Sequence, residues 1–128
     1  MTKEGVLVMK KLLSIAVPTY NGERTIGNLL NVLLPQCDER VEVIISDNAS
    51  TDTTAKVVTE YVKRYSHIKY VRNEKNIGPD SNFLQCMEMA TGKYTLLISD
   101  DDVLMENRLT DILDFLQKSF CENYISPQ

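Results

Sequence analysis

The chain has 128 residues, of which 43% are hydrophobic and 25% charged, and its net charge is −4. This length suits one domain with a single core, and the composition is that of a globular protein rather than of a disordered or fibrous one. The acidic balance supplies no basic surface for a phosphate backbone, so we expect no nucleic-acid partner.

Residues 1–11 are expected to form an N-terminal extension, followed by one domain over residues 12–128. The stretch from Met9 has the lysines and the apolar run of a signal peptide, but the run is too short and "PTYNG" follows it. No apolar segment reaches the roughly 20 residues that span a bilayer. We expect a cytoplasmic location, with the inner face of the membrane as a second option.

The three cysteines are widely spaced and form no CxxC pair. This pattern is typical of reduced thiols in a cytosolic protein. We expect Cys37, Cys86 and Cys121 to be small packing residues.

The first half of the chain predicts two strand and helix units. Residues 12–17 are a short apolar run that Pro18 ends, and residues 41–46 are a second run rich in β-branched residues. Helical spacing follows each strand. The apolar positions are Ile26, Leu29, Leu30, Leu33 and Leu34, ended by Pro35, and then Ala55, Val58, Val62 and Tyr65.

The second half repeats the alternation. Residues 67–73 predict a strand, residues 74–81 a loop, and residues 94–99 a fourth strand. The helical positions are Phe83, Cys86, Met87 and Ala90, with Gly92 as the expected terminator, and then Leu109, Ile112, Leu113, Leu116 and Phe120. Strict alternation of strands and helices predicts an α/β protein with a mostly parallel sheet and helices on both faces.

Polar residues follow all four predicted strands. They are Pro18, Thr19, Tyr20, Asn21 and Glu23 after the first strand, Asp47, Asn48 and Asp52 after the second, Asn76 and Gly78 after the third, and Asp100, Asp101 and Asp102 after the fourth. Ligands of open parallel sheets bind beyond the carboxyl ends of the strands. We therefore expect these residues to meet at one ligand-binding edge.

Some of these residues also have a structural interpretation. Ser50 and Asp52 suit helix caps, and Asn76 and Gly78 suit a turn with positive φ. Asp47 ends its strand before the cap positions, which favours a functional role. Surface exposure is expected of His67, and packing rather than ligand contact of Tyr61, Tyr65 and Tyr70.

Three consecutive aspartates, Asp100 to Asp102, follow the fourth predicted strand. One of them would suffice as a helix N-cap, so two charges have no structural purpose. Mg²⁺ and Mn²⁺ prefer oxygen ligands and take one or two carboxylates from a protein, with phosphates and water completing the shell. The triplet therefore predicts a site for Mg²⁺ or Mn²⁺.

Four segments carry a resemblance in the same order: "SIAVPTYNGERTI", "VEVIISDNASTDTT", "NEKNIG" and "GKYTLLISDDDVL". Together they resemble the N-terminal, nucleotide-binding half of family 2 glycosyltransferases of the GT-A fold. The resemblance implies a Rossmann-like sheet that binds a nucleoside-diphosphate sugar. The pattern around "NIGPDSNFLQC" is further similar to abequosyltransferases, which act on deoxysugars of bacterial surface polysaccharides.

The resemblance also implies roles for residues. Pro18, Thr19, Tyr20, Asn21 and Glu23 match the segment that lines the base and ribose, Asp47 matches an acid that contacts the base, and Asn48 stands beside it. "SDDD" stands at the family's DxD motif, which makes Asp101 the metal ligand and Asp100 a ribose or phosphate contact. Because Asp100 and Asp102 also have DxD spacing, the assignment within the triplet stays open, with Asp102 as the second candidate ligand.

The activity so implied is metal-dependent transfer of a sugar to a saccharide or lipid-linked acceptor, in cell-surface polysaccharide synthesis. Family members continue into a region that binds acceptor and supplies a general base, whereas this chain stops at Gln128. No catalytic base can be assigned, since Asp111 and Asp114 fall on a solvated helix. We expect a truncated donor-binding domain whose exposed apolar edge favours a homodimer.

Two other classes of protein are compatible with an acidic α/β chain. A receiver-like phosphoacceptor domain needs acids after the first strand and a lysine after a fifth, but "PTYN" follows the first strand and no fifth is predicted. A non-catalytic nucleotide-binding or assembly module would keep the fold without the chemistry.

Overall fold

A computed structural model of the chain describes residues 11–125, with side chains as far as residue 119. The elements in chain order are β1 (Leu13–Thr19), α2 (Ile26–Leu33), the 3₁₀ turn η1 (Leu34–Gln36), β2 (Val41–Asp47), α3 (Thr54–Arg64), β3 (Ile68–Arg72), α4 (Pro79–Glu88), β4 (Tyr94–Leu97) and α5 (Arg108–Ile125). The expected extension falls outside the described residues except for Lys11, as do the side chains of Phe120 and Cys121.

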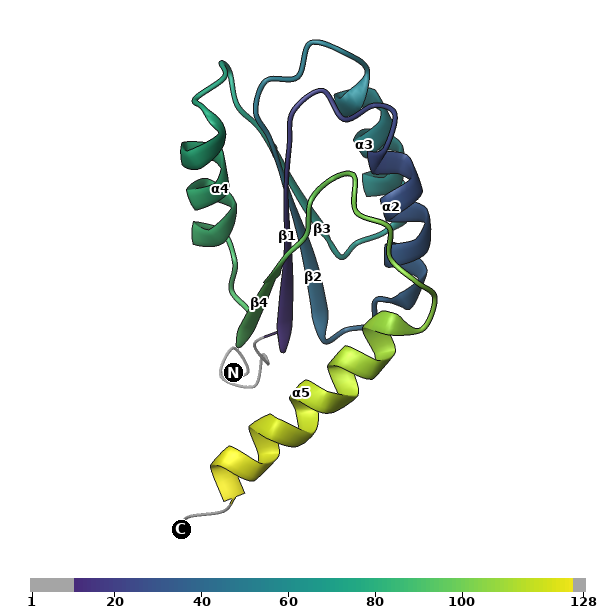
Figure 1. Ribbon diagram of the computed structural model, residues 1–128, viewed down its shortest axis with the longest axis vertical. Coiled ribbons are helices and arrows are strands. Elements are labelled where there is room, and N and C mark those ends of the chain that lie inside the picture. Colours follow the sequence, from purple (N-terminus) through teal and green to yellow (C-terminus); the bar gives the residue numbers. More distant parts are fainter. Residues whose placement is uncertain (1–10, 126–128) are drawn as a thin grey trace, which may run out of the picture.

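The four strands form one sheet in the order β3-β2-β1-β4, and all three pairings are parallel (Figure 1). Helices α2, α3 and α5 lie on one face of this sheet and α4 on the other (Figure 1). The larger core packs Ile15 and Val17 of β1 against α2, α3 and α5, and the smaller one packs Ala16 and Ile44 against Cys86 of α4. The predicted α/β fold with helices on both faces is confirmed.

Pro18 does not end the first strand, as the sequence predicted, because β1 continues to Thr19. The carbonyls of Leu12 and Ala16 accept hydrogen bonds from Tyr94 N and Ile98 N, so the even-numbered positions along β1 turn their backbone polar groups toward β4. The pairing with β4 stops at Ala16. At Pro18 the strand therefore needs no N–H, and a proline is tolerated.

The expected loop of residues 74–81 is shorter than predicted, because α4 already begins at Pro79. Proline suits the first position of a helix, where its missing N–H would have no partner within the helix. Gly92 does not terminate this helix, which ends at Glu88. A Cβ at Gly92 would lie 2.7 Å from the backbone nitrogen of Ser14, so this glycine provides space for the chain to pass β1.

The cysteines with described side chains are unpaired. Burial raises the pKa of the Cys37 thiol to about 12 and that of the Cys86 thiol to about 11. Both are therefore inert packing residues, as expected.

A buried carboxylate lies on the α4 face of β2, near the start of the strand. Glu42 accepts hydrogen bonds from Ser14 Oγ at 2.5 Å, from Thr91 N at 2.7 Å and from Thr91 Oγ1 at 2.9 Å, and Lys69 Nζ lies 2.8 Å away. Burial alone would raise the pKa of Glu42, but the bonds from Lys69, Ser14 and Thr91 outweigh it and lower the pKa to about 2. This carboxylate joins β1, β2, β3 and the turn before β4.

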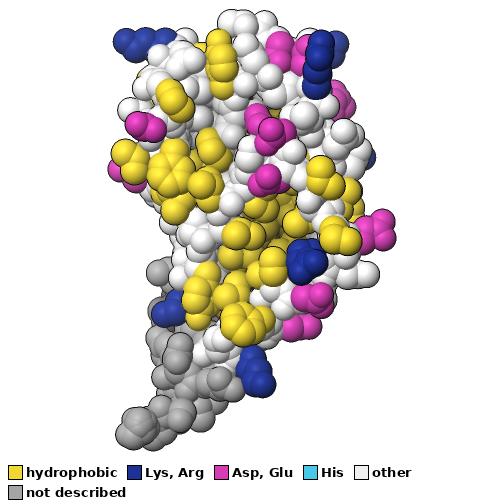
Figure 2. All heavy atoms as spheres, viewed as in Figure 1, with side chains coloured by type: hydrophobic (Ala, Val, Ile, Leu, Met, Phe, Trp, Pro, Cys, Tyr) yellow, Lys and Arg dark blue, Asp and Glu magenta, His cyan; other side chains and the backbone are white. Residues whose placement is uncertain are grey.

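Apolar side chains are exposed on the face of the molecule shown in Figure 2, over α4 and around β4 and α5. The exposed large hydrophobic residues of these three elements are Leu84 of α4, Leu97 of β4 and Phe115 of α5, which is 69% exposed. Among the described strands β4 has one neighbour, so the expected apolar edge is present. The homodimer stays a prediction.

Candidate functional site

The carboxyl ends of β1, β2 and β4 meet at one edge of the sheet. Thr19 pairs with Asp47 in the β1 and β2 register, and Asn48 N donates to the Thr19 carbonyl at 2.9 Å. Thr19 Oγ1 donates to Asp100 Oδ2 at 2.5 Å, although 81 positions separate the two residues. The predicted convergence of acidic segments at a single edge is confirmed.

Two open hollows lie at this edge. The larger, of about 380 Å³, is lined by Pro18, Thr19, Tyr20, Asn48, Asn76, Pro79, Asn82 and Asp100. The smaller, of about 320 Å³, is lined by Tyr20, Asn21, Gly22, Glu23, Arg24, Thr25, Asp52, Asp100 and Asp101. Because Tyr20 and Asp100 line both, they form the ridge between the two hollows.

Asp100 is half-buried against Thr19 and Gly22. Burial raises the pKa of Asp100, and the charge of Asp101 adds to this, whereas the Thr19 hydroxyl opposes it. A Cβ at Gly22 would lie 2.5 Å from Asp100 Oδ2, and Gly22 has no positive φ. Glycine is thus present here for space rather than for backbone conformation.

We predict that Gly22→Ala moves the Asp100 carboxylate away from Thr19 and lowers the free energy of unfolding by about 1–2 kcal/mol, the usual cost of overpacking. A crystal structure of the variant shows the position of the carboxylate, and urea unfolding gives the free energy. An unchanged Thr19–Asp100 hydrogen bond would contradict the prediction.

Asp101 and Asp102 are exposed and bonded to Ser99. Asp101 Oδ1 accepts from Ser99 Oγ at 2.5 Å, and Asp102 Oδ2 accepts from Ser99 N at 2.8 Å. Within residues 11–119 no three His, Cys, Asp or Glu side chains gather as a metal-ligating group. An exposed carboxylate beside the smaller hollow nevertheless has the chemistry that Mg²⁺ accepts from a protein when phosphates supply other ligands.

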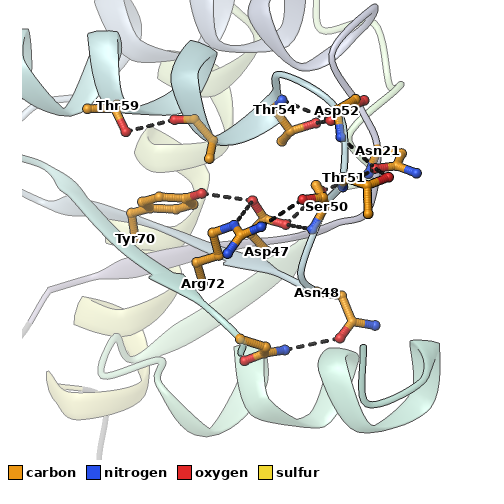
Figure 3. A network of polar contacts seen from close by, with 12 residues as sticks. Asn21, Asp47, Asn48, Ser50, Thr51, Asp52, Thr54, Thr59, Tyr70 and Arg72 are labelled. Carbon is orange, nitrogen blue, oxygen red and sulfur yellow. Dashed lines mark hydrogen bonds and ion pairs between the residues drawn. The ribbon is translucent and has the colours of Figure 1, made fainter. Parts of the chain in front are cut away.

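Asp47 is fully buried and borders neither hollow. Its Oδ1 accepts from Ser50 N at 2.9 Å and from Ser50 Oγ at 2.7 Å, and its Oδ2 accepts from the Tyr70 hydroxyl at 2.8 Å (Figure 3). The Arg72 guanidinium lies 4.0 Å from Oδ2. Both carboxylate oxygens are thus engaged within the protein.

Tyr70 therefore does more than pack, which was all that the sequence predicted. Burial and its hydrogen bond to Asp47 raise the pKa of the Tyr70 phenol. The hydroxyl remains a donor to the carboxylate, and β3 thereby contributes to the site through the strand itself.

The loop after β3 is organised by Asn48. Its Nδ2 donates to Asn76 Oδ1 at 2.9 Å and to the Gly78 carbonyl at 3.1 Å, and its Oδ1 accepts from Ile77 N at 2.9 Å. Gly78 has a φ of 91°, so the turn interpretation is right for this glycine. Asn76 serves the same turn, because its Oδ1 also accepts from Gly78 N.

The two capping predictions have different outcomes. Asp52 stands one position before the N-cap residue Thr53, and its Oδ1 accepts from the N–H of Thr54, so it satisfies a backbone donor of the first turn without being the N-cap itself. Ser50 caps no helix and instead connects two segments of the site. Its hydroxyl donates to Asp47 and accepts from Asn21 N at 2.8 Å.

A layer of uncharged polar side chains beneath the larger hollow was missed from the sequence. Asn82 Oδ1 accepts from Ser46 Oγ at 2.7 Å and from Asn73 Nδ2 at 3.2 Å, and Gln85 Nε2 donates to both Ser46 Oγ and Asn73 Oδ1. Asn82 is buried, four positions before Cys86 on the inner face of α4. The sequence did contain a signal for this layer, because the helical spacing from Cys86 places the polar Asn82 at a core position of α4.

His67 is half-buried at the start of β3 rather than exposed, and its Nδ1 has no hydrogen-bond partner. It borders neither hollow.

A parallel α/β sheet whose polar residues gather beyond the strand ends defines a Rossmann-like protein with a ligand site at this edge. The chain belongs to glycosyl transferase family 2, whose sequence model matches residues 14–126.

Two curated relatives come from bacteria. The chain is 37% identical over 108 residues to the abequosyltransferase RfbV of Salmonella typhimurium, an alignment that covers 82% of this chain and 32% of the relative. It is 33% identical over 106 residues to the putative glycosyltransferase EpsE of Bacillus subtilis, covering 82% of this chain and 38% of the relative. The chain thus spans about a third of the length of these relatives.

Among solved structures, TarS 1–349 of S. aureus in complex with UDP-GlcNAc superposes with a TM-score of 0.75 at 32% identity. The match covers 84% of this chain and 31% of TarS 1–349.

Within residues 11–125, no helix has the length and apolar character needed to cross a bilayer.

Proposed function

We propose that this chain is the donor-binding part of a glycosyltransferase, which transfers a sugar from a nucleoside-diphosphate sugar to a saccharide or lipid-linked acceptor. The supporting observation is the meeting of Thr19, Asp100 and the Asp47 network at one edge, beside two hollows. TarS, the structural relative, was solved with UDP-GlcNAc in place.

In this proposal the ridge residues Tyr20 and Asp100, which lie beyond the ends of β1 and β4, contact the nucleotide. Asp100 offers a carboxylate to ribose hydroxyls, and Tyr20 offers an exposed aromatic face. Pro18, Thr19 and Asn48 line the larger hollow. Asp47, with Asn48 beside it, supports the base end of the site.

Asp101, with Asp102 as a second candidate, would hold Mg²⁺ or Mn²⁺. When bound, such an ion stabilises the negative charge that grows on the diphosphate as the sugar leaves. The exposure of both carboxylates at the end of β4 supports this assignment. The chain's own contribution is to fix this segment through Ser99, which bonds to both aspartates.

The acceptor site and the general base belong to the remainder of a longer protein in this proposal. Asp111 and Asp114 are exposed on α5 and supply no base. The similarity to RfbV supports a role in surface polysaccharide synthesis. We propose a cytoplasmic location, with the inner face of the membrane as a second option.

Titration calorimetry with UDP, CDP, GDP and dTDP, each with and without Mn²⁺, tests the proposal. We expect one nucleotide to bind in a metal-dependent manner. Asp101→Asn should weaken binding in the presence of Mn²⁺ by about tenfold or more, because a neutral amide is a poorer ligand for a hard cation. The matched control is Asp111→Asn, the same change at an exposed position on α5.

Failure of every nucleotide to bind would favour the assembly module instead. An equal effect of the two substitutions would overturn the assignment of Asp101. A receiver-like domain is disfavoured, because it needs an acidic residue at the end of β1, where Pro18 and Thr19 stand.

A further inference from the structure

We infer that Asn21 and Glu23 are positioning residues, which lock the segment after β1 onto the start of α3 and thereby fix Tyr20 against the ligand. The resemblance assigned both residues to the lining of the nucleotide site. The inference rests on the proposed function for its ligand, but the locking itself follows from the hydrogen bonds of this chain.

Asn21 joins two segments that lie thirty positions apart. Its Oδ1 accepts from Thr51 N at 2.8 Å and from Asp52 N at 3.3 Å (Figure 3). Its own N–H donates in the opposite direction, to Ser50 Oγ at 2.8 Å. The residue has a φ of 52°, a left-handed conformation that asparagine tolerates better than most residues.

Glu23 makes a second reciprocal pair with the same segment. Its Oε1 accepts from Thr53 N at 2.9 Å and from Thr53 Oγ1 at 2.6 Å, while its N–H donates to Asp52 Oδ2 at 3.2 Å. Between the two pairs, Gly22 N donates to Thr54 Oγ1 at 2.8 Å. Three consecutive residues are thus bonded to residues 50–54, the segment that leads into α3.

Asn21 Oδ1 and Glu23 Oε1 are therefore both used within the protein. The hydrogen bonds from Thr53 lower the pKa of Glu23, which keeps its carboxylate charged as an acceptor. Although both residues line the smaller hollow, their side-chain acceptor oxygens bond to the segment after β2.

Tyr20 lies between two fixed neighbours. On one side Thr19 is bonded to Asp100, and on the other Asn21 is locked to residues 50–52. The Tyr20 side chain itself is 47% exposed and lines both hollows. An exposed aromatic ring held on a rigid backbone between two polar hollows suits contact with the flat face of a base or the apolar face of a sugar.

Two substitutions at Asn21 separate the effect of its side-chain acceptor from the effect of its left-handed backbone conformation. Asn21→Gly keeps the left-handed backbone and removes the acceptor, whereas Asn21→Asp keeps both. We expect Asn21→Gly to lower the Tm by several degrees and to weaken the tightest-binding of UDP, CDP, GDP and dTDP about tenfold. Asn21→Asp should recover most of the Tm and of the affinity.

A double-mutant cycle with Tyr20→Ala separates positioning from a general loss of structure. If Asn21 acts through Tyr20, adding Asn21→Gly to Tyr20→Ala should leave the Kd within about twofold while still lowering the Tm. The same loss of affinity with and without Tyr20 would overturn the inference. So would an Asn21→Gly variant that loses affinity at an unchanged Tm, because Asn21 would then contact the ligand directly.

The same experiments keep the two proposals apart. Absence of nucleotide binding by the unmodified chain would overturn the proposed function. The Tm values of Asn21→Gly and Asn21→Asp would still decide whether Asn21 locks the two segments, and equal Tm values would overturn that locking.

Discussion

Replacing Gly92 with alanine is expected to lower the free energy of unfolding by about 3 kcal/mol, at the upper end of overpacking costs. The new Cβ would lie 2.7 Å from both the nitrogen and Oγ of Ser14, and 3.0 Å from the carbonyl carbon of Leu13. Two of these three atoms are backbone atoms of β1, a central strand paired on both sides. These backbone atoms cannot move without disturbing the sheet, so a small local shift cannot relieve the steric overlap.

Gly27→Ala is the matched control, since its Cβ would meet nothing closer than 3.7 Å. Gly27 lies in α2, where alanine is favoured over glycine, so the free energy of unfolding should stay unchanged or rise by up to about 1 kcal/mol. Urea unfolding followed by circular dichroism measures both variants. Equal stabilities for Gly92→Ala and Gly27→Ala would contradict the close approach of residue 92 to β1.

Removal of the buried carboxylate by Glu42→Ala should cost a similar amount, about 3 kcal/mol. The substitution leaves the hydroxyls of Ser14 and Thr91 and the N–H of Thr91 without their acceptor, and Lys69 without its partner. Glu42→Gln keeps the size and one acceptor oxygen, so a smaller loss is expected. A cost for Glu42→Ala no greater than for an exposed residue would contradict this role.

The same carboxylate predicts a pH dependence. The pKa of Glu42 falls from 4.5 to about 2 on folding, so its contribution is fully present above about pH 4.5 and is lost as the pH falls toward 2. The shift corresponds to about 3 kcal/mol. Urea unfolding between pH 6 and pH 2 should therefore show a weaker acid dependence for Glu42→Ala than for the unmodified chain. Glu88→Ala, the same change at an exposed position on α4, is the matched control.

The fold could be predicted because its elements are specified by local patterns. The two central strands are buried along most of their length and read as continuous apolar runs, while α2 shows the helical stripe from Ile26 to Leu33. The boundaries failed where tertiary context decided them. Pro18 stays in β1 because β4 no longer pairs with β1 at that position. Glycine is required at position 92 by its close approach to Ser14, which lies far away in the sequence.

The place of the site could be predicted from topology, but its internal bonding could not. Polar residues after parallel strands must share an edge, and Thr19, Asp47 and Asp100 do so. Which side chain bonds to which depends on distances between segments that no local pattern encodes. The bond from the Tyr70 phenol to Asp47 and the bond from Thr53 N to Glu23 are examples, because each joins residues more than twenty positions apart.

Pro18 also affects the polarity of the larger hollow, which it lines where β1 and β4 diverge. Where two paired strands diverge, each ordinarily exposes a backbone N–H that water solvates. A ligand that binds there must displace that water. A pyrrolidine ring at the point of divergence carries no such hydrogen. Pro18 therefore presents an apolar ring to the larger hollow and leaves no main-chain donor on β1 at this position that a ligand would have to satisfy.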